Sequence, residues 1–211
     1  MRYFVKTPWW LKKIFPSYTW SIPTTEKILY LTFDDGPHPE ITPFVLKELR
    51  QYGALATFFC LGKNVLAFPE IYKQILTEGH TVGNHTQNHL NGWKTPNDVY
   101  LKDIAEAANY IDSNLFRPPY GKMTIFQARN LSAVMKGRKA RVIMWDVLSA
   151  DFDAEITEER CLQFVIFRSS PGSIIVFHDS EKAFHKLNYV LPKVLHHFTQ
   201  QGFKFLSLET S

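Results

Sequence analysis

The stretch ILYLTFDDG, Ile28–Gly36, joins a run of mostly apolar residues to two adjacent acids and a glycine. A short apolar run of this kind is typical of a strand buried in a parallel sheet. The Asp-Asp-Gly-Pro sequence that follows is good turn chemistry. The stretch therefore predicts a strand, Ile28–Phe33, that ends in a turn presenting Asp34 and Asp35.

The same pattern recurs along the rest of the chain. Short apolar runs predict strands at Ile28–Phe33, Ala54–Cys60, His80–Asn84, Asn114–Arg117, Arg141–Asp146, Ser173–His178 and Phe203–Leu208. Helices are predicted between them at 42–52, 64–78, 96–113, 124–136 and 187–201, and another begins after Thr157. Because strands alternate with helices, the pattern indicates a single α/β domain with a parallel sheet. We expect residues 1–25 to form an N-terminal extension and residues 26–211 to form the main domain.

Polar side chains stand at the ends of five of these strands. They are Asp34, His85, Arg117, Asp146 and His178. The strand number alone is compatible with a barrel or with an open, doubly wound sheet. In a parallel barrel the carboxyl ends of the strands converge on one mouth, where catalytic groups sit. The positions of these side chains therefore favour a barrel.

The most specific chemical signal is a pair of histidines near a pair of acids. His85 and His89 are four residues apart, so on a helical turn they would share one face and could share an ion. Two imidazoles and one carboxylate form a known zinc site with an open position for water. Asp35 is the expected third ligand, which leaves Asp34 free to accept a proton. A pair of surface histidines is the alternative, and the adjacent acidic motif weighs against it.

Composition and cysteine spacing weigh against nucleic-acid binding and against a zinc finger. The formal net charge of +4 is mild, and no stretch combines dense Lys and Arg with regular aromatic residues, so we expect no nucleic-acid partner. The two cysteines, Cys60 and Cys161, offer no zinc-finger spacing.

The N-terminal stretch bears on location. No signal peptide or membrane span is visible, so we expect a cytoplasmic location. The segment 9–15 is amphipathic with basic residues; it either packs across the domain as a cover or makes weak contact with a membrane surface.

Three motifs together carry a family resemblance. They are TFDDG at Thr32–Gly36, HTQNH at His85–His89 and RPPYG at Arg117–Gly121. With these motifs in this order, the chain from about Lys27 to Leu208 resembles the polysaccharide deacetylases of carbohydrate esterase family four. That family acts on N-acetylated chitin, chitooligosaccharides and peptidoglycan. The resemblance implies a distorted (β/α)7 barrel, in agreement with the strands read above.

The resemblance also implies a metal site and a general base. Asp35, His85 and His89 would hold one divalent metal ion, most often Zn²⁺, with Co²⁺, Ni²⁺ or Mn²⁺ as alternatives. Asp34 would be the general base that activates a water molecule. Arg117 would form an ion pair that orients Asp34.

The acid and the substrate contacts follow from the same resemblance. His178 would be the general acid, and Asp151 resembles the family carboxylate that partners it and keeps its pKa up. The backbone N–H of Tyr120 would help to stabilise the oxyanion. The residues assigned to the substrate and oxyanion side are Tyr120, Pro118, Phe152 and Trp145.

The fourth family motif is altered in this chain. Family members often carry Asp-x-x-Asp-Trp, whereas Leu148–Phe152 reads LSADF, with Leu148 in place of the first acid and Phe152 in place of the tryptophan. The change falls on the carbohydrate-stacking wall and on the substrate class rather than on the chemistry. Asp146 is the alternative second acid.

The predicted function is metal-dependent hydrolysis of the N-acetyl group of an N-acetylglucosamine-containing saccharide, with acetate as product. One alternative keeps the scaffold but hydrolyses an amide or cyclic imide in a small intracellular substrate. The other is an inactive relative that only binds carbohydrate.

Overall fold

The computed structural model describes residues 3–208, and its centre is one parallel sheet. The strands are β1 (Ile28–Asp34), β2 (Ala56–Cys60), β3 (Thr81–Asn84), β4 (Leu115–Phe116), β5 (Arg141–Val142), β6 (Val147–Leu148), β7 (Ile174–His178) and β8 (Lys204–Phe205). Their order is β5-β4-β3-β2-β1-β7-β6, and β8 pairs with the start of β1. Each pair of neighbours runs parallel, and β1 lies in the middle between β2 and β7.

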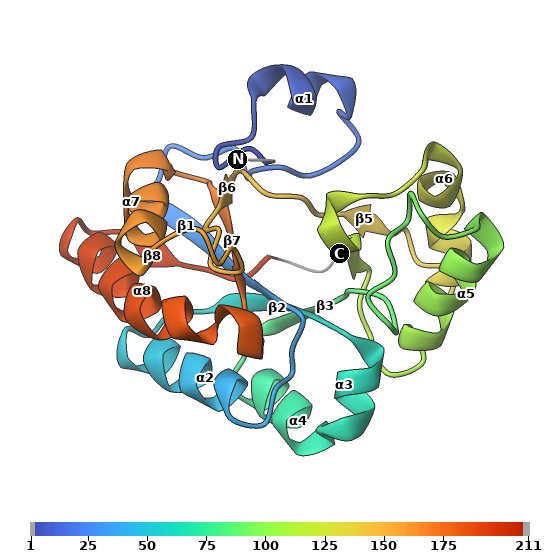
Figure 1. Ribbon diagram of the computed structural model, residues 1–211, viewed down its shortest axis with the longest axis horizontal. Coiled ribbons are helices and arrows are strands. Elements are labelled where there is room, and N and C mark those ends of the chain that lie inside the picture. The colour runs from blue at the N-terminus through green and yellow to red at the C-terminus, as the bar shows by residue number, and fades with distance from the viewer. Residues whose placement is uncertain (1–2, 209–211) are drawn as a thin grey trace.

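Helices surround this sheet, as Figure 1 shows. They are α1 (Trp9–Ile14), α2 (Ile41–Gln51), α3 (Gly62–Ala67), α4 (Pro69–Thr77), α5 (Asn97–Ala107), the short 3₁₀ helix η1 (Pro119–Gly121), α6 (Ile125–Val134), α7 (Glu158–Arg168) and α8 (Glu181–Gln200). The arrangement is the predicted distorted (β/α)7 barrel in a single domain. Within residues 3–208, no helix is both long and apolar enough to cross a membrane.

The alternation of side chains along β1 separates the core from the interior of the barrel. Leu29, Leu31 and Phe33 are fully buried and belong to the largest core cluster, which also contains residues of α2 and α8. The Phe33 ring stacks on the rings of Phe58, at 5.1 Å, and Phe177, at 5.9 Å. Because successive strand residues point to opposite faces, the polar residues between them face the other way. One face of β1 therefore packs against helices, and the other supplies polar groups to the interior.

The predicted strand Arg141–Asp146 is wrong as a single strand. Its first residues form β5 at one edge of the sheet, and the chain then crosses to the opposite edge, where β6 begins. The N-terminal extension closes the seam between these edges: Thr19 bridges to Ile143, and Lys6 bridges to Val147. Part of the backbone of the crossing segment bonds to neighbouring strands, because the Ile143 N–H donates to Phe116 of β4 and the Asp146 N–H to Ile174 of β7. The extension takes up the rest: the Met144 N–H donates to the Thr19 carbonyl oxygen, and the Asp146 carbonyl oxygen accepts from the Thr7 N–H.

Asp146 anchors that extension and does not act as a second acid beside His178. Its carboxylate accepts hydrogen bonds from Lys6 Nζ at 2.6 Å, Lys12 Nζ at 2.7 Å and Ser173 Oγ at 2.5 Å. Burial would raise the pKa of Asp146, but the bonds from Lys12, Lys6 and Ser173 hold it below the ordinary value. The alternative that gave Asp146 a catalytic role is therefore corrected, since its lone pairs are committed to this anchor.

The predicted helices are present, but several boundaries differ: the helix predicted at 96–113 ends at Ala107, and α1 lies in the extension, where no helix was predicted. The predicted helix 64–78 is two helices, α3 and α4, because Pro69 lacks a backbone N–H and disfavours helical geometry at Phe68 before it. The predicted helix 187–201 begins earlier, at Glu181, and continues through Pro192. The helix α7 begins after Thr157 as expected, and the Thr157 hydroxyl caps it by accepting from the Arg160 N–H.

Candidate active site

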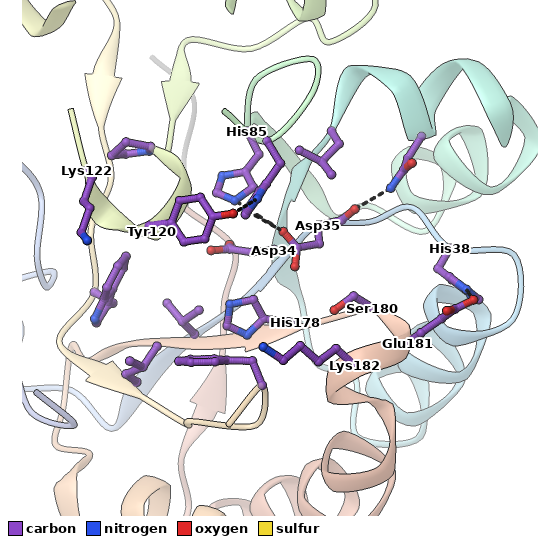
Figure 2. Close-up of a pocket in the computed structure, with 18 of the residues that line it drawn as sticks. Asp34, Asp35, His38, His85, Tyr120, Lys122, His178, Ser180, Glu181 and Lys182 are labelled. Atoms are coloured by element: carbon purple, nitrogen blue, oxygen red, sulfur yellow. Dashed lines mark hydrogen bonds and ion pairs between the residues drawn. The ribbon is translucent and has the colours of Figure 1, made fainter. Parts of the chain in front are cut away.

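A cavity of about 740 Å³ opens at the carboxyl ends of the central strands. Asp34 ends β1 and His178 ends β7, and the two residues are partners in the register of that strand pair. Figure 2 shows Asp34, Asp35 and His85 grouped on one side of the cavity, Tyr120 extending over it and His178 facing them. Of the five strand-end side chains predicted to meet at one mouth, Asp34, His85 and His178 line this cavity and Arg117 contacts Asp34, whereas Asp146 does not line it.

Asp34 is held by a fully buried arginine. Arg117 Nη1 donates to Asp34 Oδ1 at 2.6 Å and to Thr32 Oγ1 at 2.7 Å. Its remaining nitrogens donate to the carbonyl oxygens of Ile143 and Met144. Burial lowers the pKa of Arg117, and the ion pair with Asp34 opposes that shift. A buried guanidinium with every edge bonded is rigid, so it fixes the position of one Asp34 oxygen.

Asp35, His85 and His89 bring three ligand atoms together. One atom from each residue lies within 4.8 Å of the others. Asp35 Oδ1 is 3.2 Å from His89 Nε2 and 3.7 Å from His85 Nε2, yet this buried oxygen accepts no hydrogen bond. Burial would raise the pKa of Asp35, but the imidazoles around it outweigh burial and lower it. The set therefore consists of one carboxylate oxygen that lacks a hydrogen bond and two imidazole nitrogens that face it. These three donors suit a divalent metal ion.

The histidine pair does not lie on a helix, which corrects the expected geometry. His85 directly follows β3, and Thr86 and His89 both have left-handed backbone conformations, with φ of 70° and 60°. Asp103 of α5 holds this loop, because its carboxylate accepts from the backbone N–H of Gln87 and from both the backbone and the side chain of Asn88. A loop, not an i, i+4 helical face, therefore brings the two imidazoles together.

The second ring nitrogen of each histidine has a partner. His85 Nδ1 lies 2.8 Å from the Arg117 carbonyl oxygen, and this contact directs Nε2 toward Asp35. Burial lowers the pKa of His85 to about 4, so its imidazole is neutral near pH 7. His89 Nδ1 lies 3.2 Å from the Tyr120 hydroxyl. Both rings are thus oriented by contacts outside the ligand set.

The turn that carries Asp35 is held from two sides. Asp35 has a φ of 84°, which is unusual for a residue with a side chain, and its carbonyl oxygen accepts from Asn64 Nδ2 at 2.7 Å. The Gly36 N–H donates to Asp179 Oδ1, and Thr42 Oγ1 donates to Asp179 Oδ2. A Cβ on Gly36 would lie 2.1 Å from the Asp179 carboxylate, so only glycine fits there. Burial raises the pKa of Asp179 to about 8.

His178 forms the expected pair with Asp151. His178 Nδ1 lies 2.7 Å from Asp151 Oδ1, and the backbone N–H of His178 donates to Asp151 Oδ2 at 2.8 Å. Burial would lower the pKa of His178, but the Asp151 charge and hydrogen bond raise it to about 9. The imidazole is therefore protonated near pH 7, with its Nε2 side available to the cavity.

Aromatic and apolar residues form the rest of the wall. Tyr120 has a left-handed backbone, with φ of 60°, and lines the cavity together with Pro118 and Trp145. The Phe152 ring lies 5.2 Å from the His178 ring and 5.4 Å from the Tyr3 ring. Leu148, at the position of the missing family acid, also lines the cavity. All the residues predicted to contact substrate are therefore at the cavity or its rim.

Three supporting residues escaped the sequence reasoning. Asn64 and Asp103 lie on helices, where a polar residue reads as an ordinary solvent-facing one. Asp179 directly follows His178, and this adjacency is the one sequence signal for it. Each acts on the backbone of a metal-side loop, a contact that no local pattern encodes.

Comparison with known proteins identifies the family. The polysaccharide deacetylase family matches residues 21–135. A peptidoglycan-N-acetylglucosamine deacetylase of Bacillus cereus is 35% identical over 199 residues, which cover 90% of each chain. A chitooligosaccharide deacetylase of Azorhizobium caulinodans is 34% identical over 165 residues, 75% of this chain and 76% of the relative.

The fold comparison agrees with the sequence comparison. The crystal structure of a peptidoglycan N-acetylglucosamine deacetylase, solved in complex with a naphthalenyl N-oxidanyl-benzamide, superposes with a TM-score of 0.83 at 31% identity. The superposition covers 96% of this chain and 95% of the other. The chain belongs to the polysaccharide deacetylase family.

Proposed function

We propose that this protein removes the N-acetyl group from an N-acetylglucosamine-containing saccharide and releases acetate. The observation that carries the proposal is the placement of two groups on paired strands. Asp34 is positioned as a proton acceptor and His178 is protonated as a donor, both beside the Asp35–His85–His89 set. The names of the relatives support the choice of an N-acetylated saccharide.

Asp35, His85 and His89 would hold one divalent ion, and we assign Zn²⁺ to them. Two imidazoles and one carboxylate fit a catalytic zinc site, in which a further position stays open. The same donors accept Co²⁺, Ni²⁺ or Mn²⁺, since imidazole and carboxylate suit all of these ions. When bound, the ion supplies Lewis acidity toward the amide carbonyl and toward the attacking water.

Asp34 takes a proton from a water molecule while the oxygen of that water attacks the amide carbonyl carbon. Arg117 holds one oxygen of Asp34, and this leaves the second oxygen to accept the proton. The hydrogen bonds around Arg117 prevent the pair from moving, so the base is already in place before substrate arrives. The backbone N–H of Tyr120 donates to the carbonyl oxygen as it gains negative charge.

His178 completes the reaction by donating its proton to the amide nitrogen as the C–N bond breaks. An amine is a poor leaving group without that proton, and Asp151 keeps the imidazole protonated for this step. The products are acetate and a free amino sugar. Trp145, Pro118 and Phe152 form the walls against which the acetyl group and the sugar ring would lie.

Acetate release tests the proposal directly. Zinc-loaded protein is incubated with N-acetylated chitooligosaccharides and with peptidoglycan fragments, and acetate is measured by a coupled assay. The expected result is turnover on at least one of these substrates and its loss in Asp34→Asn. The absence of acetate from all substrates, with zinc bound in stoichiometric amount, contradicts the proposal. Ring opening of cyclic imides, measured in the same preparation, then tests the small-substrate alternative, and strong saccharide binding without turnover supports the inactive relative.

A further inference from the structure

The helix α1 presents an apolar surface that nothing in the described chain covers. No residue of this helix is buried. Trp9 is 69% exposed, Trp10 44% and Ile14 59%, and Phe4, whose ring contacts Trp10 edge to face, is 56% exposed. We call these four side chains the N-terminal patch. Figure 1 shows α1 at the outer edge of the molecule, apart from the helices that cover the sheet.

The opposite side of the same segment is firmly attached to the barrel. Lys12 pairs with Asp146, as does Lys6 before the helix. Leu11 and Phe15 pack against the cluster that contains Trp20 and Met144. The helix is thus held in one orientation, and the N-terminal patch is what remains on its outer side.

The basic residues in excess are concentrated in the N-terminal segment. Residues 1–25 contain Arg2, Lys6, Lys12 and Lys13 and no acidic residue, so they carry the whole formal net charge of +4. Residues 26–211 contain 20 basic and 20 acidic residues and have a formal net charge of zero. Beside the patch, Lys13 Nζ lies 4.9 Å from the centroid of the Trp9 ring and has no acidic partner among residues 3–208. Lys6 and Lys12 pair with Asp146, so Lys13 is the cation that this segment presents beside the apolar patch.

We infer that the N-terminal patch docks on the surface of an anionic lipid bilayer. Tryptophan and lysine side by side suit the headgroup region, where indole rings sit and lysine meets lipid phosphates. The four apolar side chains are large enough in sum to enter the headgroup region together, and Lys13 beside them meets the lipid phosphates. A protein is the alternative occupant, and the outcomes below distinguish it.

Vesicle sedimentation of the full-length protein tests this inference. One set of vesicles is pure phosphatidylcholine, and the other contains equal parts of phosphatidylcholine and phosphatidylglycerol. We expect binding to the anionic vesicles to be at least about tenfold stronger, and to fall as salt is raised from about 20 to about 500 mM because the charges are screened. Binding is measured without substrate, so its outcome is independent of the proposed deacetylation.

Matched variants locate the binding surface. The double change Trp9→Ser and Trp10→Ser is expected to weaken binding to anionic vesicles at least about tenfold, and Lys13→Gln about fivefold. Phe167→Ser is the control, because Phe167 is apolar and 77% exposed but lies on α7. Circular dichroism and thermal unfolding check that each variant folds. The variants of α1 are expected to fold because this helix has no buried residue.

Three outcomes would overturn the inference. The first is no binding to anionic vesicles at low salt, or equal binding to both vesicle types. The second is an unchanged affinity of the double variant. The third is another occupant: a wild-type dimer in analytical ultracentrifugation that the double variant lacks, or retention on insoluble chitin that the double variant loses.

Discussion

Asp34 and His178 end two paired strands in the middle of the sheet, whereas His85 and His89 lie on a loop beyond the end of β3. The first pair is placed by strand register, so its geometry comes with the fold itself. The second pair depends on left-handed residues and on a carboxylate from α5. We call the first pair, with Arg117 and Asp151, the strand side of the site, and the second pair with its loop the loop side. The comparison teaches that the proton-transfer pair and the two histidine ligands are supported by different parts of the molecule and should fail separately.

Replacement of Asp34 should have the largest effect and should leave the loop side intact. In Asp34→Asn we expect kcat to fall by about 10²–10⁴-fold, because the proton acceptor is lost. Metal content measured by mass spectrometry should stay at one ion per chain. His85→Ala is the contrasting variant, since it should lose both metal and turnover. Loss of metal from Asp34→Asn would show that the two sides are not separable.

Replacement of Asp151 should change the pH dependence on the strand side. The pKa of His178 is raised from its ordinary 6.5 to about 9, so the donor stays protonated until the pH passes about 9, and activity should fall above that. In Asp151→Asn, the largest effect that opposes burial is lost and only the charges of Asp35 and Asp34 remain, so the pKa of His178 falls and the alkaline limb of kcat/KM should move to lower pH. We also expect a loss of about 10²-fold at pH 8. An alkaline limb that does not move would exclude His178 as the group that sets it.

Replacement of Asp103 tests the loop side. In Asp103→Ala the metal Kd should rise by about 10–100-fold, because three hydrogen bonds to the histidine loop are lost. Turnover should return when the metal is saturating, since Asp34 and His178 are untouched. Glu106→Ala is the control, an exposed acid on the same helix. Activity that excess metal does not restore would mean that the loop also supports catalysis.

The smallest effect is expected at Tyr120. Tyr120→Phe removes the hydroxyl that contacts His89 Nδ1 and keeps the backbone N–H. We expect the metal Kd to rise about two- to tenfold, the value of a single hydrogen bond, while kcat changes by less than about threefold. Isothermal titration with zinc and steady-state kinetics measure the two quantities. A large fall in kcat would assign the hydroxyl a direct part in the reaction.

The sequence predicted the strand-side half of the site well because that half follows short-range rules. A buried apolar run before two acids indicates a strand end, and parallel strand ends meet, so Asp34, Arg117 and His178 could be placed together before any coordinates. The family, the barrel and the proposed class of reaction follow from the same motifs, and the comparisons confirm them.

The loop side could not be predicted in the same way. The spacing of His85 and His89 suggests a helical turn, but the loop between them contains left-handed Thr86 and is held at Asn88 by Asp103, 15 residues farther along the chain. The crossing between β5 and β6 was missed for a related reason. The segment after Arg141 has the composition of a strand, and only its distant partner Thr19 shows that it spans the seam. Long-range contacts of this kind leave no local periodicity.

The seam has a practical consequence for how the enzyme is handled. The family match begins at residue 21, yet Lys6 and Thr19 supply bridges that complete the wall between β5 and β6. A chain that begins at residue 21 would lack the residues that hydrogen-bond to the segment between β5 and β6. Asp146 would then stay buried without Lys6 and Lys12. Expression clones should therefore retain the first 25 residues, because shortened ones would yield aggregating material.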